Sequence, residues 1–374
     1  FAQYDNTGRI LDFLVKNFDI TVQFSFDHLR LKNGRKTNFI KIYENGKLVE
    51  EKKLLSLRTP PFLLFSSLPF VAFLMFIQTF FYSHKVTKKY GKFDIFFTVN
   101  AFSGCIGLLL KKFLLVKKTV FWVWDYFPLS YPDWRMKLAR WVYWQFDKPC
   151  MQYSDRIIFT NKKLSTLRKK AGIIKSKSKP TIVPLGTNVQ KVIIRERKKI
   201  VIGFLGMLKA SQGIDALIDN LPHVIKHIPH ARFEIIGSGP EEQRLKEKAK
   251  KYGKYIIFHG FIENQNKIEK ITKNWTIGTA LYTPDESNES YWGDPSKIKI
   301  YISLGIPVIT TNVSHFSDEI TKAKAGKVVP HGSPEHFVQA MKHIIRYHTA
   351  YQRDALKLAK KYHYEKIYPE IFNV

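Results

Sequence analysis

Residues 291–311 read YWGDPSKIKIYISLGIPVITT, and this stretch decides the fold. Asp294 is expected to cap a helix and Pro295 to occupy its first turn, since these residue types favour helix starts. Gly305 is expected to end the helix. The apolar run Ile306–Thr311 is typical of a buried parallel strand. Together these features predict one helix–strand unit of an α/β fold.

The start of this helix is a candidate anion site. The N–H groups at a helix N-terminus attract negative charge. Ser296 and Lys297 add a hydroxyl group and a positive charge there. A diphosphate group would suit such a site. On this stretch alone, an ordinary helix with a lysine in its first turn is the simpler interpretation.

Several short apolar runs, each ending in glycine, proline or a polar turn, precede this stretch. They are KIVIGFLGMLKASQG (199–213), RFEIIGSGPE (232–241), IIFHGF (256–261) and TIGTALYTP (276–284). In this order and spacing they resemble the C-terminal domain of retaining GT-B glycosyltransferases, a family that uses nucleotide-diphospho-sugars. The resemblance covers roughly residues 84–374 and is strongest over 199–330.

The resemblance implies an α/β fold of GT-B architecture, with two Rossmann-like domains of doubly wound parallel sheet that face a cleft. We expect an acceptor- and membrane-facing domain at residues 1–189 and a nucleotide-sugar-binding domain at 190–355. A C-terminal helix at 356–374 is expected to return to the first domain. The length suits two domains, and strands alternating with helices suit parallel sheets. Because the chain starts at Phe1 rather than Met, we expect a fragment or trimmed product with an N-terminally truncated first domain.

The composition limits the function classes. The 374 residues include 61 Lys and Arg against 31 Asp and Glu, a formal net charge of +30. Anionic lipids, phosphate-bearing substrates or nucleic acid are the partners that such a charge attracts. No nucleic-acid module is evident and the aromatic residues lie in apolar runs, so we expect no nucleic-acid partner. Cys105 and Cys150 lie in apolar surroundings, which argues against a disulfide framework or a metal cluster and favours a reducing cytoplasm.

A hydrophobic segment, Pro60–Phe81, carries no charge over 22 residues and is flanked by Arg58 and Lys85. It is long enough to span a bilayer as a helix. Pro69 and Gln78 weaken that interpretation, and a single span would divide the first domain between two sides of the membrane. We expect a shallow interfacial or re-entrant segment with a cationic collar, which makes the protein peripheral or monotopic at the cytoplasmic face. A buried core helix is the alternative.

The resemblance implies that loops following strands in the second domain bind the donor, since ligands lie beyond the carboxyl ends of parallel strands. The candidate binding residues are Gly206, Lys209, Gly237, Gly239, Pro240, Glu241, His259, Gly260, Tyr282, Asp294, Pro295, Ser296 and Lys297. Glycine permits close approach of the backbone to a phosphate. For His259 we expect a backbone role. A simple strand-to-helix turn is the alternative at 237–241.

Four contact positions depart from the family's pattern. Met207 and Gln212 stand where the family has an Arg and a Lys, and Trp292 and Ile300 stand where it commonly has glutamates. Lys209 is a candidate replacement for the lost positive charge. Glu286 and Glu289 are candidate replacements for the acids, although a solvated acidic loop is the simpler interpretation.

Asp125 and Lys297 are the candidate catalytic residues. Relatives often have His-Asp at the end of a first-domain strand, and here Trp124 and Asp125 stand there. Asp125 would orient a sugar or accept the acceptor's proton; an N-cap role is the alternative. Gly8 resembles the first glycine-containing loop of the family, which faces the diphosphate. Without an Asp-x-Asp motif, Lys297, Lys209 and helix dipoles would neutralise the leaving group, with no metal or other cofactor.

We therefore expect a metal-independent, retaining glycosyltransferase. It would move a sugar from a nucleotide-diphosphate-sugar donor to a lipid-linked or glycan acceptor at an anionic membrane surface. A catalytically silent GT-B scaffold in polysaccharide assembly is the main alternative, motivated by Met207, Gln212 and Ile300. A non-hydrolysing sugar-nucleotide epimerase shares the architecture, but its paired acids and cleft histidine are poorly matched here.

Overall fold

The computed structural model describes residues 9–26, 38–56, 68–124, 126, 134–174, 180–189, 192, 194 and 199–373. Its internal contacts divide the chain into two compact units. Unit 1 contains Arg9–Val183 and the C-terminal residues from Ile367, and unit 2 contains Pro184–Lys366. The sequence predicts the boundary between the two domains after residue 189, whereas in the structure the chain passes from unit 1 to unit 2 after Val183.

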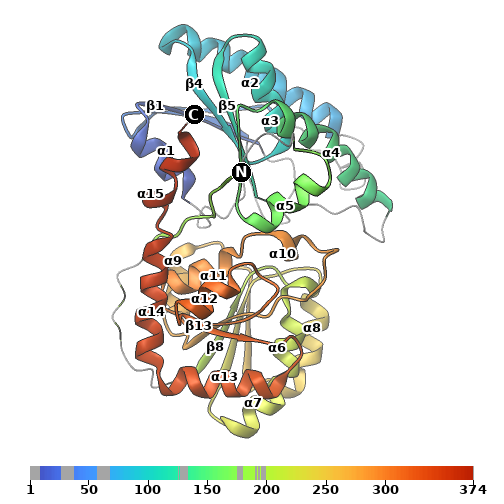
Figure 1. Cartoon of the computed structure of the whole chain (residues 1–374), viewed down its shortest axis with the longest axis vertical. Helices are drawn as coiled ribbons and strands as arrows, with labels where there is room; N and C mark the ends of the chain where they lie inside the picture. Colours follow the sequence, from blue (N-terminus) through green and yellow to red (C-terminus); the bar gives the residue numbers. More distant parts are fainter. Residues whose placement is uncertain are drawn as a thin grey trace. The chain divides into compact units, whose positions relative to one another are not determined.

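The elements of unit 1 begin with a helix and an antiparallel region and then alternate between helices and strands (Figure 1). In chain order they are α1 (Ile10–Asn17), β1 (Ile20–Ser25), β2 (Phe39–Glu44), β3 (Lys47–Lys53), α2 (Leu68–Tyr90), β4 (Phe93–Thr98), α3 (Ala101–Lys112), β5 (Val116–Val123), α4 (Trp134–Tyr153), β6 (Arg156–Phe159), α5 (Lys162–Lys170), β7 (Thr181–Ile182) and α16 (Pro369–Phe372).

Unit 1 has two sheets. Strands β1, β2 and β3 form an antiparallel sheet, and β4, β5, β6 and β7 form a parallel sheet in chain order. The hairpin between β2 and β3 turns at Asn45 and Gly46, whose φ angles of 48° and 83° suit a two-residue hairpin. An Asn-Gly pair between two strands is typical of such a turn.

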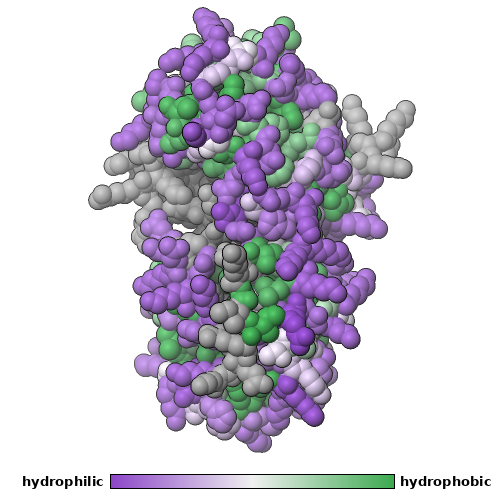
Figure 2. Space-filling view, turned by 90° about the vertical axis from the view of Figure 1, so that its left-hand side faces the viewer, coloured by the Kyte–Doolittle hydropathy of each residue, from purple (hydrophilic) through white to green (hydrophobic). Residues whose placement is uncertain are grey.

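Part of the hydrophobic segment forms α2. Residues 60–67 of the predicted segment lie outside the described residues, and the remainder begins a helix that continues to Tyr90. Met75 and Val86 are buried against the unit, whereas Phe70 and Phe81 are exposed. In the described ranges, no helix has both the length and the hydrophobicity to cross a bilayer. In the upper part of Figure 2, hydrophobic groups interrupt a largely hydrophilic surface.

Unit 2 is a regular alternation of strands and helices. In chain order its elements are β8 (Val201–Leu205), η3 (Ala210–Gln212), α6 (Ile214–Asp219), α7 (Leu221–His227), β9 (Arg232–Ile236), α8 (Glu242–Ala249), η4 (Lys250–Tyr252), β10 (Ile256–Gly260), α9 (Gln265–Thr272), β11 (Ile277–Ala280), α10 (Glu289–Trp292), α11 (Ser296–Ser303), β12 (Val308–Thr311), α12 (Ser317–Lys322), β13 (Gly326–Val329), α13 (Pro334–Arg346), α14 (His348–Lys361) and α15 (Tyr364–Ile367), whose last residue already belongs to unit 1.

The sheet of unit 2 has six parallel strands in the order β10-β9-β8-β11-β12-β13. This is the strand order of a Rossmann fold: β9 and β10 follow on one side of β8, and β11, β12 and β13 follow on the other, so the strand order reverses between β8 and β11. Ligands bind at such a switch point, beyond the carboxyl ends of the strands. The strands predicted from the apolar runs of this region are confirmed.

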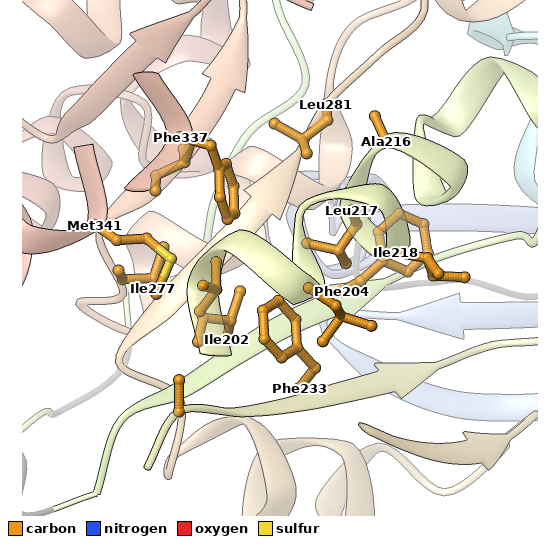
Figure 3. Close-up of a cluster of buried hydrophobic side chains, with 14 of the residues drawn as sticks. Ile202, Phe204, Ala216, Leu217, Ile218, Phe233, Ile277, Leu281, Phe337 and Met341 are labelled. Carbon is orange, nitrogen blue, oxygen red and sulfur yellow. The ribbon is translucent and has the colours of Figure 1, made fainter. Parts of the chain in front are cut away.

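The core of unit 2 lies between this sheet and its helices. Figure 3 shows Phe204 of β8 and Phe233 of β9 packed beside Leu217 of α6, and Phe337 and Met341 of α13 joining the same cluster. Strands that are buried on both faces read as continuous apolar runs, and this explains the composition of β8. The carboxyl ends of these strands are therefore held on a rigid support.

Candidate functional site

Three loops meet at the carboxyl ends of β8, β9 and β10, and backbone hydrogen bonds join them. Gly206 N–H donates to Ile236 O at 3.0 Å, and Gly237 N–H donates to Gly260 O at 2.9 Å. Leu208 N–H donates to the Ser238 carbonyl at 3.0 Å. Because each bond joins one loop to the next, the loops form a single framework.

The glycines of this framework allow its backbones to approach each other closely. Gly237 has φ +142°, and a Cβ atom there would lie 1.9 Å from the Gly206 carbonyl oxygen. A Cβ at Gly239 would lie 2.3 Å from the Leu208 carbonyl oxygen. The Gly-Ser-Gly segment is therefore required for loop-to-loop packing.

Lys297, in the first turn of α11, is the central side chain of the site. It is only 7 % exposed. Its Nζ lies 4.0 Å from the ring centre of Phe204 and 5.2 Å from that of Tyr282. A Cβ at Gly206 would lie 3.3 Å from this Nζ, so the glycine leaves room for the ammonium group. Cation–π contacts of this kind hold the charge in place.

The surroundings of Lys297 disfavour its charge. Burial lowers its pKa well below the ordinary value, and the positive charge of Lys209 lowers it further. Burial also raises the pKa of the Tyr282 phenol, which therefore stays neutral. A group that adds negative charge here would restore the ammonium form.

Gln212 is the hydrogen-bond partner of Lys297. Its Oε1 accepts from Lys297 Nζ, and its Nε2 donates to Ser290 Oγ of α10 at 2.7 Å. Ser290 Oγ also lies 3.0 Å from Ser211 Oγ, so η3 is fixed against α10. Gln212, which stands where the family has a lysine, thus has a role of its own, which is to hold Lys297 of α11.

The prediction that Asp294 caps α11 is wrong. Pro295 occupies the N-cap position, and α11 has no side-chain cap hydrogen bond. The Asp294 carboxylate instead accepts from Leu185 N–H at 2.6 Å and from Lys299 Nζ. Charge-assisted bonds to a buried ammonium are stronger than a cap bond, which explains its orientation. Asp294 therefore fixes the first residues of unit 2 to α11.

The start of α11 is less open than the sequence suggested. Ser296 N–H donates to Asp294 O at 2.8 Å, and Ile298 N–H donates to Pro295 O at 3.0 Å. The Lys297 side chain, rather than a row of free N–H groups, is the main feature of this helix start. The predicted end is confirmed, because Gly305 has φ +65° and follows the last helical residues.

The acidic loop before α11 is occupied by its own contacts. Trp292 Nε1 donates to Glu286 O at 2.8 Å. Burial raises the pKa of the Tyr291 phenol, and its hydrogen bond to the Glu286 carboxylate raises that pKa further. Ile300 packs in the core cluster beneath α11. The side chain of Glu289 lies outside what the structure describes.

Other predicted residues lie in different surroundings. His259 and Glu234 line a separate cavity of about 680 Å³ beside α9, with His259 Nε2 3.5 Å from a Glu234 oxygen. Glu241 pairs with Arg244 at the surface at 2.6 Å, and Pro240 is exposed. The structure thus brings together Gly206, Lys209, Gly237, Gly239, Gly260, Tyr282 and Lys297. The side chains of His259, Pro240 and Glu241 lie in other surroundings.

Gly8 and Asp125 lie outside the described residues, so their predicted roles stay predictions. Next to Asp125, the Trp124 ring packs edge-on against Trp122, with centroids 5.3 Å apart. Within the described ranges, no group of three or more His, Cys, Asp and Glu side chains is placed to hold a metal ion.

Two residues of the site escaped the sequence analysis. From the sequence, Phe204 is only a residue of a core strand and Gln212 only a departure from the family's pattern, whereas in the structure both contact Lys297. The signal that would have found Phe204 is its position at the end of β8, directly before the glycine loop.

Both the sequence and the structure of the chain are similar to those of known proteins. Residues 199–347 match the model of the family described as Glycosyl transferases group 1. The chain is similar in structure to sucrose-phosphate synthase of Thermosynechococcus elongatus, with 16 % identity, a TM-score of 0.61, and coverage of 84 % of this chain and 78 % of that one.

Two further structures are similar. The lipopolysaccharide outer core galactosyltransferase WaaB, in its apo form, has 16 % identity, a TM-score of 0.55 and coverage of 80 % of both chains. Anabaena Alr3699/HepE in complex with UDP has 12 % identity, a TM-score of 0.59, and coverage of 79 % of this chain and 80 % of that one. No curated protein matches the sequence. At these identities the structures show the fold, which is GT-B, and the family match concerns residues 199–347.

Proposed function

Because residues 199–347 form a glycosyltransferase group 1 domain within a GT-B fold, we propose that the chain transfers a sugar from a nucleotide-diphosphate-sugar to a lipid-linked or glycan acceptor. We propose further that the reaction retains the anomeric configuration and needs no metal. Unit 2 would bind the donor, and unit 1 would face an anionic membrane at its cytoplasmic surface.

The buried ammonium of Lys297 is the observation that carries this proposal. In the transfer, the bond between the anomeric carbon and the diphosphate oxygen breaks, and a bond to the acceptor oxygen forms. Negative charge then gathers on the leaving diphosphate. Lys297, Lys209 and the start of α11 would stabilise it, since preorganised positive groups in a dry site are effective there. Asp125 is our candidate for accepting the acceptor's proton.

Replacing Lys297 with methionine tests this assignment. The change keeps the side-chain length and removes the charge, so we expect the affinity for UDP or GDP to fall by roughly tenfold or more. Isothermal titration calorimetry measures it. Lys270→Met, on the exposed face of α9, is the control and should bind as the wild type does. Equal affinity in the Lys297→Met variant would contradict the proposed diphosphate site.

UDP is the first nucleotide to test. Anabaena Alr3699/HepE is in complex with UDP, and its fold is similar to that of this chain. WaaB acts as a lipopolysaccharide outer core galactosyltransferase by its name, which supports a lipid-linked glycan as the acceptor class. Thermal-shift measurements with UDP, GDP and ADP, and with their sugars, would identify the donor.

The membrane part of the proposal rests on charge and on α2. Residues 9–183 and 367–374 contain 32 Lys and Arg against 12 Asp and Glu, a net charge of +20. Phe70, Phe73 and Phe81 are exposed on α2, and Lys85 and Lys88 follow at the same helical spacing. Aromatic residues followed by cations are typical of a helix at a lipid interface.

A catalytically silent scaffold is the second candidate, and Gln212 favours it. Its carboxamide occupies the hydrogen-bonding side of Lys297, where a diphosphate would bind. Release of nucleotide from a panel of nucleotide sugars, with a membrane extract as acceptor, separates the two functions. A scaffold would release none, whereas a transferase would release nucleotide with at least one donor.

A further inference from the structure

Helix α4 exposes two tryptophans on one face. Trp134 is 67 % exposed, Leu138 50 % and Trp141 53 %. Their spacing of four and three residues places all three on one side of the helix. Figure 1 shows α4 at the outside of unit 1. Exposed tryptophans grouped in this way mark an interaction surface.

The opposite face of α4 is firmly anchored, so the exposed face has a fixed direction. Asp147 forms a buried ion pair with Arg168 at 2.8 Å, and the Arg168 guanidinium lies 4.8 Å from the Trp144 ring centre. Cys150 and Met151 are buried in the core of unit 1. The helix therefore cannot rotate to cover its tryptophans.

The charges on α4 suit an anionic surface. Asp147 is the one acidic residue in the sequence of the helix, and its carboxylate is buried with Arg168. Lys137 and Lys148 are exposed and fall on the same side as Trp141. A face with exposed tryptophan and lysine but no exposed carboxylate has the chemistry of the bilayer interface, where indole rings lie at headgroup level.

We infer that the face formed by Trp134, Leu138 and Trp141 docks into the headgroup region of an anionic bilayer. This surface is separate from α2 and gives unit 1 a second lipid contact. The inference rests on the proposed membrane function. Two contacts are needed for stable attachment when each alone gives only weak binding.

The test is the binding of the full chain to vesicles of phosphatidylcholine, with and without phosphatidylglycerol. We expect the wild type to sediment with the anionic vesicles. The Trp134→Ala/Trp141→Ala variant should partition roughly tenfold less. Tyr153→Ala is the matched control, since Tyr153 is an exposed aromatic residue of the same helix about 100° away from Trp134. It should bind as the wild type does.

A second measurement covers the case in which the alanine variant does not fold. Brominated lipids quench tryptophans that enter the bilayer, whereas Trp122 and Trp275 are fully buried in the protein. Trp134→Phe/Trp141→Phe should fold, keep most of its vesicle binding and lose most of the quenching. Quenching equal to that of the wild type would show that these indoles do not enter lipid.

The outcomes separate this inference from the proposed function. Equal vesicle binding by wild type and double-alanine variant would overturn the role of α4 and leave the membrane proposal intact. A wild type that does not bind anionic vesicles, but self-associates or binds a soluble glycan through these tryptophans, would overturn both the membrane part of the proposed function and the docking of α4. Donor binding is measured separately with UDP. The Lys297→Met variant should bind UDP weakly, whereas the tryptophan variants should bind it as the wild type does.

Discussion

Lys297 holds its ammonium group against a carboxamide and two aromatic rings rather than against a carboxylate. Burying a charge without an opposite charge is costly, and the lowered pKa of this lysine reflects that cost. Two residues later, Lys299 is also buried, but it pairs with Asp294. The two lysines of one helix therefore offer a direct comparison between a binding role and a structural one.

Lys297→Met should stabilise the protein while it weakens nucleotide binding. Removing an unfavourable buried charge should raise the free energy of unfolding by about 0.5–2 kcal/mol. Lys299→Met should lower it by roughly 3 kcal/mol or more, because Asp294 then stays buried without its ion-pair partner. Thermal unfolding of both variants measures this contrast. A loss of stability in Lys297→Met would show that the lysine is a structural residue.

The pKa of Lys297 also predicts a pH dependence. Between its lowered pKa in the folded chain and the ordinary lysine value in the unfolded chain, the unfolded chain binds more protons. The free energy of unfolding should therefore rise with pH in that window. A bound diphosphate favours the ammonium form, so binding should take up a proton and weaken as the pH rises.

Calorimetry of UDP binding above pH 8, in buffers of different ionisation enthalpy, measures this proton uptake. The wild type should take up a fraction of a proton that changes with pH, and Lys297→Met should take up none. Uptake that is the same in both proteins would assign the proton to another group.

At the residue scale, the sequence predicted where Lys297 and the start of its helix lie, but not the contacts around them. The run from Asp294 to Lys297 marks the helix start correctly. It does not reveal that the Asp294 carboxylate binds Leu185, which is 109 residues away, or that Gln212 binds Lys297. Both contacts depend on long-range packing, and residue spacing carries no information about them.

At the scale of the elements, the hydrogen-bonded framework of the loops after β8, β9 and β10 depends on Gly237. An alanine there would place its Cβ 1.9 Å from the Gly206 carbonyl oxygen, at a φ angle that side chains rarely adopt. We expect Gly237→Ala to lower the free energy of unfolding by about 2 kcal/mol or more, and to weaken UDP binding because Gly206 must move away from Lys297.

Gly253→Ala is the control for this prediction. Gly253 lies at the end of η4 with φ −50°, and a Cβ there meets its nearest neighbour, the Lys250 carbonyl oxygen, at 3.4 Å. This variant should be as stable as the wild type or slightly more stable, and should bind UDP normally. A Gly237→Ala variant that behaves in the same way would remove the packing argument for the Gly-Ser-Gly segment.

Most elements were predictable because their signals are local. The short apolar runs located the strands of unit 2. Helix α4 continues through Pro149 to Tyr153, although proline disfavours a helix interior. Burial of Cys150 and Met151 stabilises this last part against the unfavourable proline, and that is a tertiary effect.

At the scale of the whole molecule, the chain ends in the unit where it began. Ile367–Val374 belongs to unit 1, although α14 and nearly all of α15 belong to unit 2. Tyr368 is fully buried, and its ring packs edge-on against Phe13 and Trp122 with centroids 5.7 Å and 5.3 Å apart. The last helix thus completes the core of unit 1, and its loss should affect that unit first.

Phe372→Ala tests this dependence. The Phe372 ring lies 5.8 Å from Phe13 and 5.4 Å from Phe97, so its removal should destabilise unit 1 by about 2–3 kcal/mol. Hydrogen exchange should accelerate in β4 and β5 and stay unchanged in β8 and β9. Tyr347→Ala, at an exposed aromatic residue of unit 2, should change neither region. Faster exchange in both units would mean that they unfold together, and that α16 stabilises the whole molecule rather than the unit to which it belongs.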